Sequence, residues 1–201
     1  MKQLQALRGK ELVPDEIQRA LAFLRGEELP EKLGKGSRHW LADELLTSLR
    51  MQNPLPGNLA QDLSSVAFQP ETDPVVRDYI LQHLGHLWEQ QGASPEIETA
   101  LWQGVATLSD TTTPGTSLIA LASGYERDQN TGRLAEVRAK ALQLAEDQTV
   151  SLATRVTALS IAGDSGSAAV KEFAGKLAAD ESTPLILKKV AERVARVPGA
   201  Q

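Results

Sequence analysis

Two histidines and a glutamate stand at helical spacing near the middle of the chain. His83, His86 and Glu89 are each three residues apart, so on a helix they would lie on one face. Two imidazoles and a carboxylate on one face can ligate a metal ion. However, His83 borders the apolar stripe predicted on the same helix. A metal would need further ligands, and the only other histidine in the sequence is His39. We therefore expect surface and boundary histidines, with no metal site and no cofactor.

The remaining reactive residue types form no catalytic motif. The chain has no cysteine, which removes disulfides, thiolate metal sites and cysteine nucleophiles. Serine, histidine and aspartate all occur, but no motif places them together. Segment 164–168 contains a glycine but lacks the preceding strand and the following lysine of a phosphate-binding loop. We therefore predict no catalytic residue and a protein that is not an enzyme.

Charge and hydropathy restrict the partners. A formal net charge of −5 argues against a nucleic-acid binder, which normally carries a basic stripe. One locally basic segment near the end of the sequence contains Lys188, Lys189, Arg193 and Arg196. Cations near the C-terminus of a helix stabilise the helix, and this role explains the segment. No apolar run approaches the roughly 20 residues of a membrane span, and residues 1–13 do not resemble a signal peptide. We expect a cytoplasmic protein without a membrane span; a targeting segment removed ahead of residue 1 is the alternative.

The elements that must position these side chains are pairs of amphipathic helices. Apolar residues recur at helical spacing in five pairs, and the second helix of each pair follows a turn marked by Gly, Asp, Thr or Pro. These second helices are expected to open at Gly36-Ser37, Asp73-Pro74, Thr113-Pro114, Asp147-Gln148 and Thr183-Pro184. The pairs are predicted as hairpins 14–51, 57–90, 95–128, 132–163 and 166–197, between a tail at 1–13 and a tail at 198–201. The hairpins start 34 to 43 residues apart, and a period of this length is typical of stacked repeats. We therefore predict one domain over 14–197, with its weakest join at 53–56.

One segment supports a family resemblance. Residues 73–85 read Asp-Pro-Val-Val-Arg-Asp-Tyr-Ile-Leu-Gln-His-Leu-Gly, which resembles the turn and second helix of a HEAT-type repeat. The resemblance implies an all-α, right-handed α-α superhelix (a HEAT/armadillo-like solenoid) of about five helical hairpins. It also implies that Asp73 and Arg77 bond along the stack. In the fourth pair, Arg155 lies several residues too far beyond the turn for that role. A tetratricopeptide array is the rival, but its Trp-x-x-Leu-Gly pattern is absent.

The same resemblance indicates where a partner would bind. In HEAT-like proteins the second helices usually line the concave face, so their solvent-side residues are the candidates for partner binding. These candidates are Trp40, Asp43, Glu44, Asp78, Gln82 and His86. Exposed aromatics are enriched as interface anchors, although packing of Trp40 on the N-terminal tail or on the 26–36 loop is the simpler alternative.

The predicted function is a non-enzymatic scaffold that binds a protein or peptide on the concave face. A nucleic-acid-acting HEAT-like protein of the DNA glycosylase type and a histidine-dependent metal enzyme are the alternatives. The identity of the partner and the oligomeric state are left open.

Overall fold

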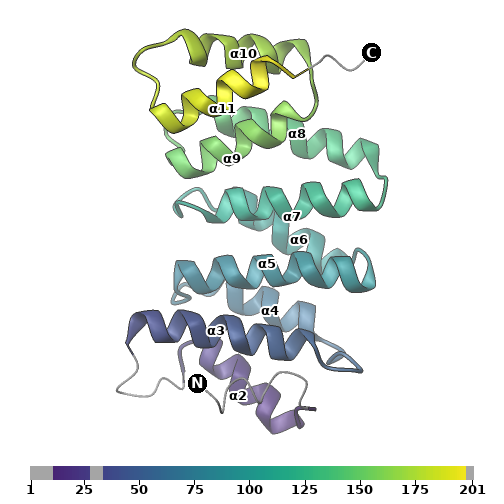
Figure 1. Ribbon diagram of the computed structural model, residues 1–201. Helices are drawn as coiled ribbons and strands as arrows, with labels where there is room; N and C mark the ends of the chain where they lie inside the picture. Colours follow the sequence, from purple (N-terminus) through teal and green to yellow (C-terminus); the bar gives the residue numbers. More distant parts are fainter. Residues whose placement is uncertain (1–10, 28–33, 198–201) are drawn as a thin grey trace. The chain divides into compact units, whose positions relative to one another are not determined.

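The chain folds into α-helices joined by short turns (Figure 1). The computed structural model describes residues 11–27 and 34–197, and within these ranges there are ten helices and no strand. The predicted all-α class is therefore confirmed, while the predicted tails fall mainly outside the described residues. The helices are α2 (Pro14–Leu24), α3 (Lys35–Arg50), α4 (Leu59–Ala67), α5 (Pro74–Gln91), α6 (Pro95–Ala106), α7 (Thr113–Arg127), α8 (Thr131–Glu146), α9 (Leu152–Gly163), α10 (Ala168–Ala179) and α11 (Leu185–Ala195).

Several helices begin and end at local signals. Pro14 is the first residue of α2, where a missing N–H costs nothing. The side chain of Asp73 accepts a hydrogen bond from the Val75 N–H at 2.9 Å and so caps α5. Gly26, with a φ of +82°, follows α2 in a conformation that favours glycine. A side-chain N-cap such as Asp73 typically contributes about 1 kcal/mol to stability.

The start of α9 differs from the prediction. This helix begins at Leu152, after the N-cap Ser151, and not at Asp147-Gln148. Asp147 is instead the C-cap of α8, and its carboxylate accepts hydrogen bonds from the N–H and the hydroxyl of Thr149. An Asp that bonds the backbone two residues later makes a turn of its own, and this turn resembles a helix start in sequence.

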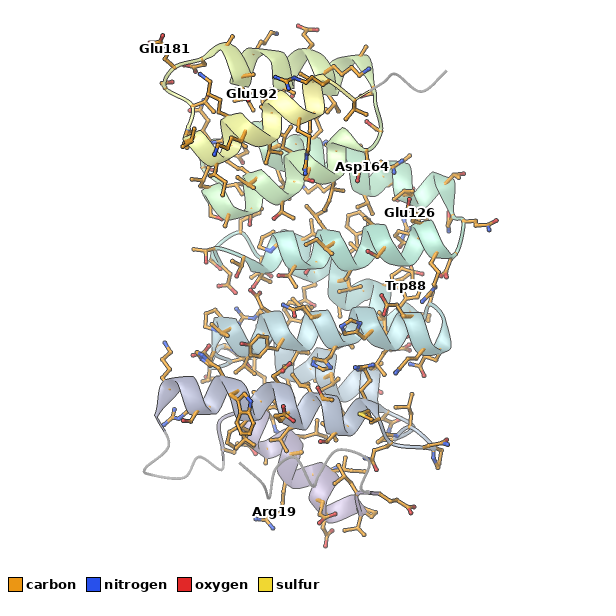
Figure 2. All side chains as sticks on the ribbon, viewed as in Figure 1. Arg19, Trp88, Glu126, Asp164, Glu181 and Glu192 are labelled. Atoms are coloured by element: carbon orange, nitrogen blue, oxygen red, sulfur yellow. The ribbon has the colours of Figure 1, made fainter. Side chains whose placement is uncertain are left out.

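The chain divides into two compact units, Met1–Ala100 and Leu101–Gln201. The division falls inside α6 and does not coincide with the predicted weak join at 53–56. In the first unit α3 packs against α5, α4 packs against α5, and α2 contacts both α3 and α4. The largest side chains with no solvent exposure in this core include Leu46, Ile80, Leu84 and Trp88; Figure 2 labels Trp88.

In the second unit α7, α9 and α11 lie side by side (Figure 1). Helix α8 packs against α7 and α9, and α10 packs mainly against α11. The approach of α9 to α11 is close, because Gly163 at the end of α9 meets the side chain of Val194. In both units, therefore, alternate helices of the chain are neighbours.

Candidate interaction surface on helices α3 and α5

Two histidine–aspartate contacts join α3 to α5. His39 Nε2 lies 3.1 Å from Asp73 Oδ1, and His83 Nε2 lies 3.2 Å from Asp43 Oδ1. His39 and Asp43 lie on α3, His83 lies on α5, and Asp73 is the N-cap of α5, so the two contacts run in opposite senses between the segments. Together with the buried apolar contacts, they fix how the side chains of α3 and α5 are placed relative to one another.

Asp73 combines a capping role with this interhelical role. Partial burial raises the pKa of its carboxyl, but the Val75 N–H, His39 and Lys35 together outweigh burial and hold that pKa below its usual value. The Nζ of Lys35 lies 3.9 Å from Asp73 Oδ2. The carboxylate is therefore ionised near neutral pH, and its charge is balanced by groups on α3.

His83 is a buried side chain that contacts Asp43. It is 5% exposed, and this burial lowers its pKa, as do Arg50 and His86, while Asp43 opposes the shift. Its Nδ1 is buried with no hydrogen-bond partner. A histidine that acts as a general base must present a ring nitrogen to its substrate, whereas here one nitrogen faces Asp43 and the other lies in the interior.

His83, His86 and Glu89 do not gather as a set of metal ligands. His86 Nδ1 lies 3.0 Å from Glu89 Oε2, and the His83 and His86 rings meet edge to face with centroids 5.9 Å apart. Over residues 11–27 and 34–197, no three His, Cys, Asp or Glu side chains converge as metal ligands.

Four of the six predicted partner-binding residues lie at the surface. Trp40 is 38% exposed, Gln82 and His86 are exposed, and the side chain of Asp43 is about half exposed. These four residues, on two helices that pack together, are called the α3–α5 surface below. The exposed part of Trp40 is accessible to a partner.

Glu44 and Asp78 are buried, so the expectation that they face solvent was wrong. The predicted stripe on α3 was Leu41, Leu45 and Leu49, yet Leu41 and Leu45 are only half-buried. The fully buried apolar residues of α3 are Ala42, Leu46 and Leu49. Because α3 contacts α2 as well as α5, its buried face is wider than one stripe predicts.

Asp73 and Arg77 both bond beyond their own helix. Asp73 bonds back to α3 through His39, as described above. Arg77 donates from Nε to the Ala67 carbonyl at the end of α4, at 2.6 Å. It also donates from Nη2 to the carbonyls of Thr72 and Gln69, at 3.4 and 3.5 Å. Arg77 thus satisfies the Ala67 carbonyl, which the end of α4 leaves without a helical partner, and also bonds two carbonyls of the turn that follows.

Arg155 repeats this arrangement in the second unit. It is the fourth residue of α9, as Arg77 is the fourth residue of α5, and its Nε donates to the Ala145 carbonyl of α8 at 3.1 Å. The interpretation that Arg155 lies too late was therefore wrong, because it counted from Asp147. The N-cap Ser151 was the signal that sequence reasoning missed.

Two further clusters in the second unit make contacts of their own. The Arg133 guanidinium lies over the rings of Trp102 and Tyr125, at 5.9 and 5.6 Å from their centroids. On the basic helix α11, Arg193 donates to the Ser160 hydroxyl of α9 at 2.8 Å. Figure 2 labels Glu192 on the same helix, so α11 is not uniformly basic.

Comparisons with known proteins add no family to this description. No protein-family model matches the chain, and searches of curated proteins and of solved structures find no similar protein. Among the described residues, none of the helices is both long and apolar enough to cross a bilayer.

Proposed function

We propose that this chain is a non-enzymatic interaction module that binds a partner protein or peptide through the α3–α5 surface. The observation that carries the proposal is the exposure of Trp40 on a helix whose position is fixed by two histidine–aspartate contacts. Tryptophan is among the residues most often found to dominate binding energy. A surface that is already ordered before binding loses less conformational entropy when a partner docks.

The side chains around Trp40 indicate what a partner must offer. Asp43 is half exposed and accepts hydrogen bonds, while the exposed Gln82 amide both donates and accepts. His86 already contacts Glu89, so it offers one remaining ring nitrogen. A fitting partner therefore carries an apolar side chain for Trp40 and hydrogen-bond donors for Asp43 and Gln82.

We also propose that the helices form a HEAT-like, right-handed superhelix of about five hairpins. The contacts between alternate helices in each unit and the equivalent roles of Arg77 and Arg155 support a repeated unit. Repeat proteins of this kind are extended. Small-angle X-ray scattering of the full chain should therefore report an elongated particle, and a near-spherical particle would contradict the superhelix.

The binding proposal is tested by capture from the native source with three forms of the chain as bait. The wild type is compared with Trp40→Ala/Gln82→Ala and with a matched control, Leu108→Ala/Gln143→Ala. The control also removes one exposed large apolar side chain and one exposed glutamine, both in the second unit.

A specific partner should be retained by the wild type and by the control. It should be lost from the surface variant, because a tryptophan anchor contributes roughly 2 kcal/mol or more, equivalent to about thirtyfold in affinity. A partner retained equally by all three baits would contradict the α3–α5 surface as the binding site.

A further inference from the structure

The exposed acidic group of the α3–α5 surface has no cation that balances its charge. The carboxylate of Asp43 is about half exposed, and its only hydrogen bond or ion pair within the described residues is the contact with His83. Burial lowers the pKa of His83, so this imidazole is neutral at pH 7 and does not neutralise the carboxylate. Because a carboxylate offers about four acceptor sites, most of those of Asp43 remain open to a partner.

The aromatic group of the surface lies next to this carboxylate. Trp40 and Asp43 are three residues apart on α3, and residues at that spacing lie on one face of a helix with their Cβ atoms about 5–6 Å apart. Trp40 is also partly exposed. An accessible part of an indole beside an open carboxylate suits a side chain that combines a positive charge with a flat, weakly hydrated surface.

The charges on the neighbouring segments also favour a cation. Between residues 51 and 100 the sequence contains seven acidic residues and a single basic one, Arg77, which donates to carbonyls after α4. Arg50 lies on α3, but it is seven residues beyond Asp43, or about 10 Å along the helix axis. The potential around Trp40 and Asp43 therefore attracts a basic segment more than an acidic one.

The second unit shows how this chain combines the same groups with an arginine. The Arg133 guanidinium lies 5.9 Å from the ring centroid of Trp102, and its Nη1 lies 2.6 Å from a carboxylate oxygen of Glu136. Indole, carboxylate and guanidinium are thus brought together within the chain. On α3 the indole and the carboxylate are present at the surface, and none of the arginines in the described part of the chain lies over the Trp40 ring.

We propose that the protein partner of the α3–α5 surface presents an arginine, which packs on Trp40 and donates to Asp43. This inference rests on the proposed function, because it names the chemistry that the same surface recognises. An arginine supplies in one side chain an apolar stem for the indole and a fork of N–H donors for the carboxylate. Lysine fits less well, because its ammonium is a compact, strongly hydrated charge without a flat face.

The experiment titrates ¹⁵N-labelled full chain with three blocked pentapeptides to millimolar concentration and follows the amide and indole N–H resonances. The peptides are glycine except for a central arginine, lysine or citrulline, which has the shape of arginine without its charge. The arginine peptide should shift the Trp40 indole and the amides of residues 40–43. The indoles of Trp88, which is buried, and Trp102, which donates to Tyr125, should not move. The arginine peptide should bind about threefold more tightly than the lysine peptide, and the citrulline peptide should not bind detectably.

Two substitutions separate the two contacts of the arginine. Asp43→Asn removes the charge and should weaken binding of the arginine peptide by about threefold. Its matched control is Asp62→Asn, which removes a half-exposed acid from α4 in the same unit and should have a smaller effect. Trp40→Leu keeps an apolar side chain without the ring and should abolish the preference for arginine over lysine. Its control is Met51→Ala, which removes an exposed apolar side chain at the end of α3 and should retain that preference.

Equal affinity for the arginine and lysine peptides, binding of the citrulline peptide, or no shift with any peptide would each overturn the proposal. So would an effect of Asp43→Asn no larger than that of Asp62→Asn. The comparison of peptides uses the wild type alone, so it stands even if a variant does not fold. Sedimentation equilibrium of the chain without peptide tests the other source of an arginine, a second copy of the chain. A dimer that Asp43→Asn dissociates would overturn the assignment to a separate partner.

This inference and the binding proposal fail in different experiments. A partner that is lost from the Trp40→Ala/Gln82→Ala bait, together with titrations that show no preference for arginine, contradicts only the assignment of arginine. A partner that all three baits retain equally, together with titrations that select arginine, contradicts only the binding proposal.

Discussion

Replacing Gly163 by alanine tests how closely α9 and α11 pack. A Cβ at this position would lie 2.5 Å from Cγ2, 3.1 Å from Cγ1 and 3.3 Å from Cβ of Val194. Gly163 is buried at the end of α9, and Val194 is buried on α11. Valine strongly prefers one side-chain rotamer in a helix, so it cannot rotate away without cost.

Two opposing contributions set the size of the effect. Overpacking of this kind typically costs about 1–3 kcal/mol. Alanine in place of glycine gains up to about 1 kcal/mol inside a helix, and less at its last residue. The Gly163→Ala variant should therefore lose about 1–2 kcal/mol of unfolding free energy.

The second variant, Val194→Ala, removes all the side-chain atoms that crowd the new Cβ except the Cβ of residue 194. In this background Gly163→Ala should be neutral or stabilising by up to about 1 kcal/mol. The coupling between the two substitutions should thus be about 2 kcal/mol, which is within the range for residues in direct contact.

The free energy of unfolding of all four proteins is measured by urea titration followed by far-ultraviolet circular dichroism. Gly175→Ala is the control, because this glycine lies inside α10 with no atom within 4 Å of the new Cβ. It should stabilise the protein by up to about 1 kcal/mol. The reasoning is refuted if Gly163→Ala costs the same with and without Val194, or behaves like Gly175→Ala.

Four further substitutions test individual polar groups. Ser117→Ala should leave stability unchanged or raise it by about 1 kcal/mol, because the Ser117 hydroxyl is buried without a partner; a urea midpoint that falls markedly would show a hydrogen bond that the structure lacks. Burial lowers the pKa of His83, so below about pH 6.5 the unfolded chain takes up the proton first and the folded state loses stability as pH falls. Urea titrations at pH 7.5 and 5.5 should show a smaller loss for His83→Gln than for the wild type, and equal losses would contradict a buried neutral imidazole. Arg77→Met should cost about 2 kcal/mol and Arg155→Met about 1 kcal/mol, because Arg77 donates to three carbonyls and Arg155 to one; thermal melts that reverse this order would contradict the capping role.

The helix pattern could be predicted because the signals that begin and end these helices are local. Pro14, with acidic residues in the next two positions, and Asp73-Pro74 mark helix starts through contacts within a few residues of the chain. The positive φ of Gly26 after α2 is likewise a property of one residue. Such signals need no knowledge of the neighbouring helices.

The rest of the site depends on contacts between helices. Glu44 and Asp78 were expected at the surface because a single apolar stripe predicts a single buried face. Contacts of α3 with two other helices make its buried face wider. The pairing of His39 with Asp73 spans 34 residues, and that of Asp43 with His83 spans 40. No local pattern in the sequence identifies these pairs.

The position of an arginine relative to the helix N-cap predicts its hydrogen-bond partner better than its position relative to the turn motif does. Counted from the turn, Arg155 is displaced from Arg77; counted from the N-cap, the two occupy the same position and donate to equivalent carbonyls. Arg38 occupies that position too, but its Nε has no partner. Because the same residue type in the same helical position is satisfied within the chain in α5 and α9, the open Nε in α3 marks a departure from the repeated arrangement.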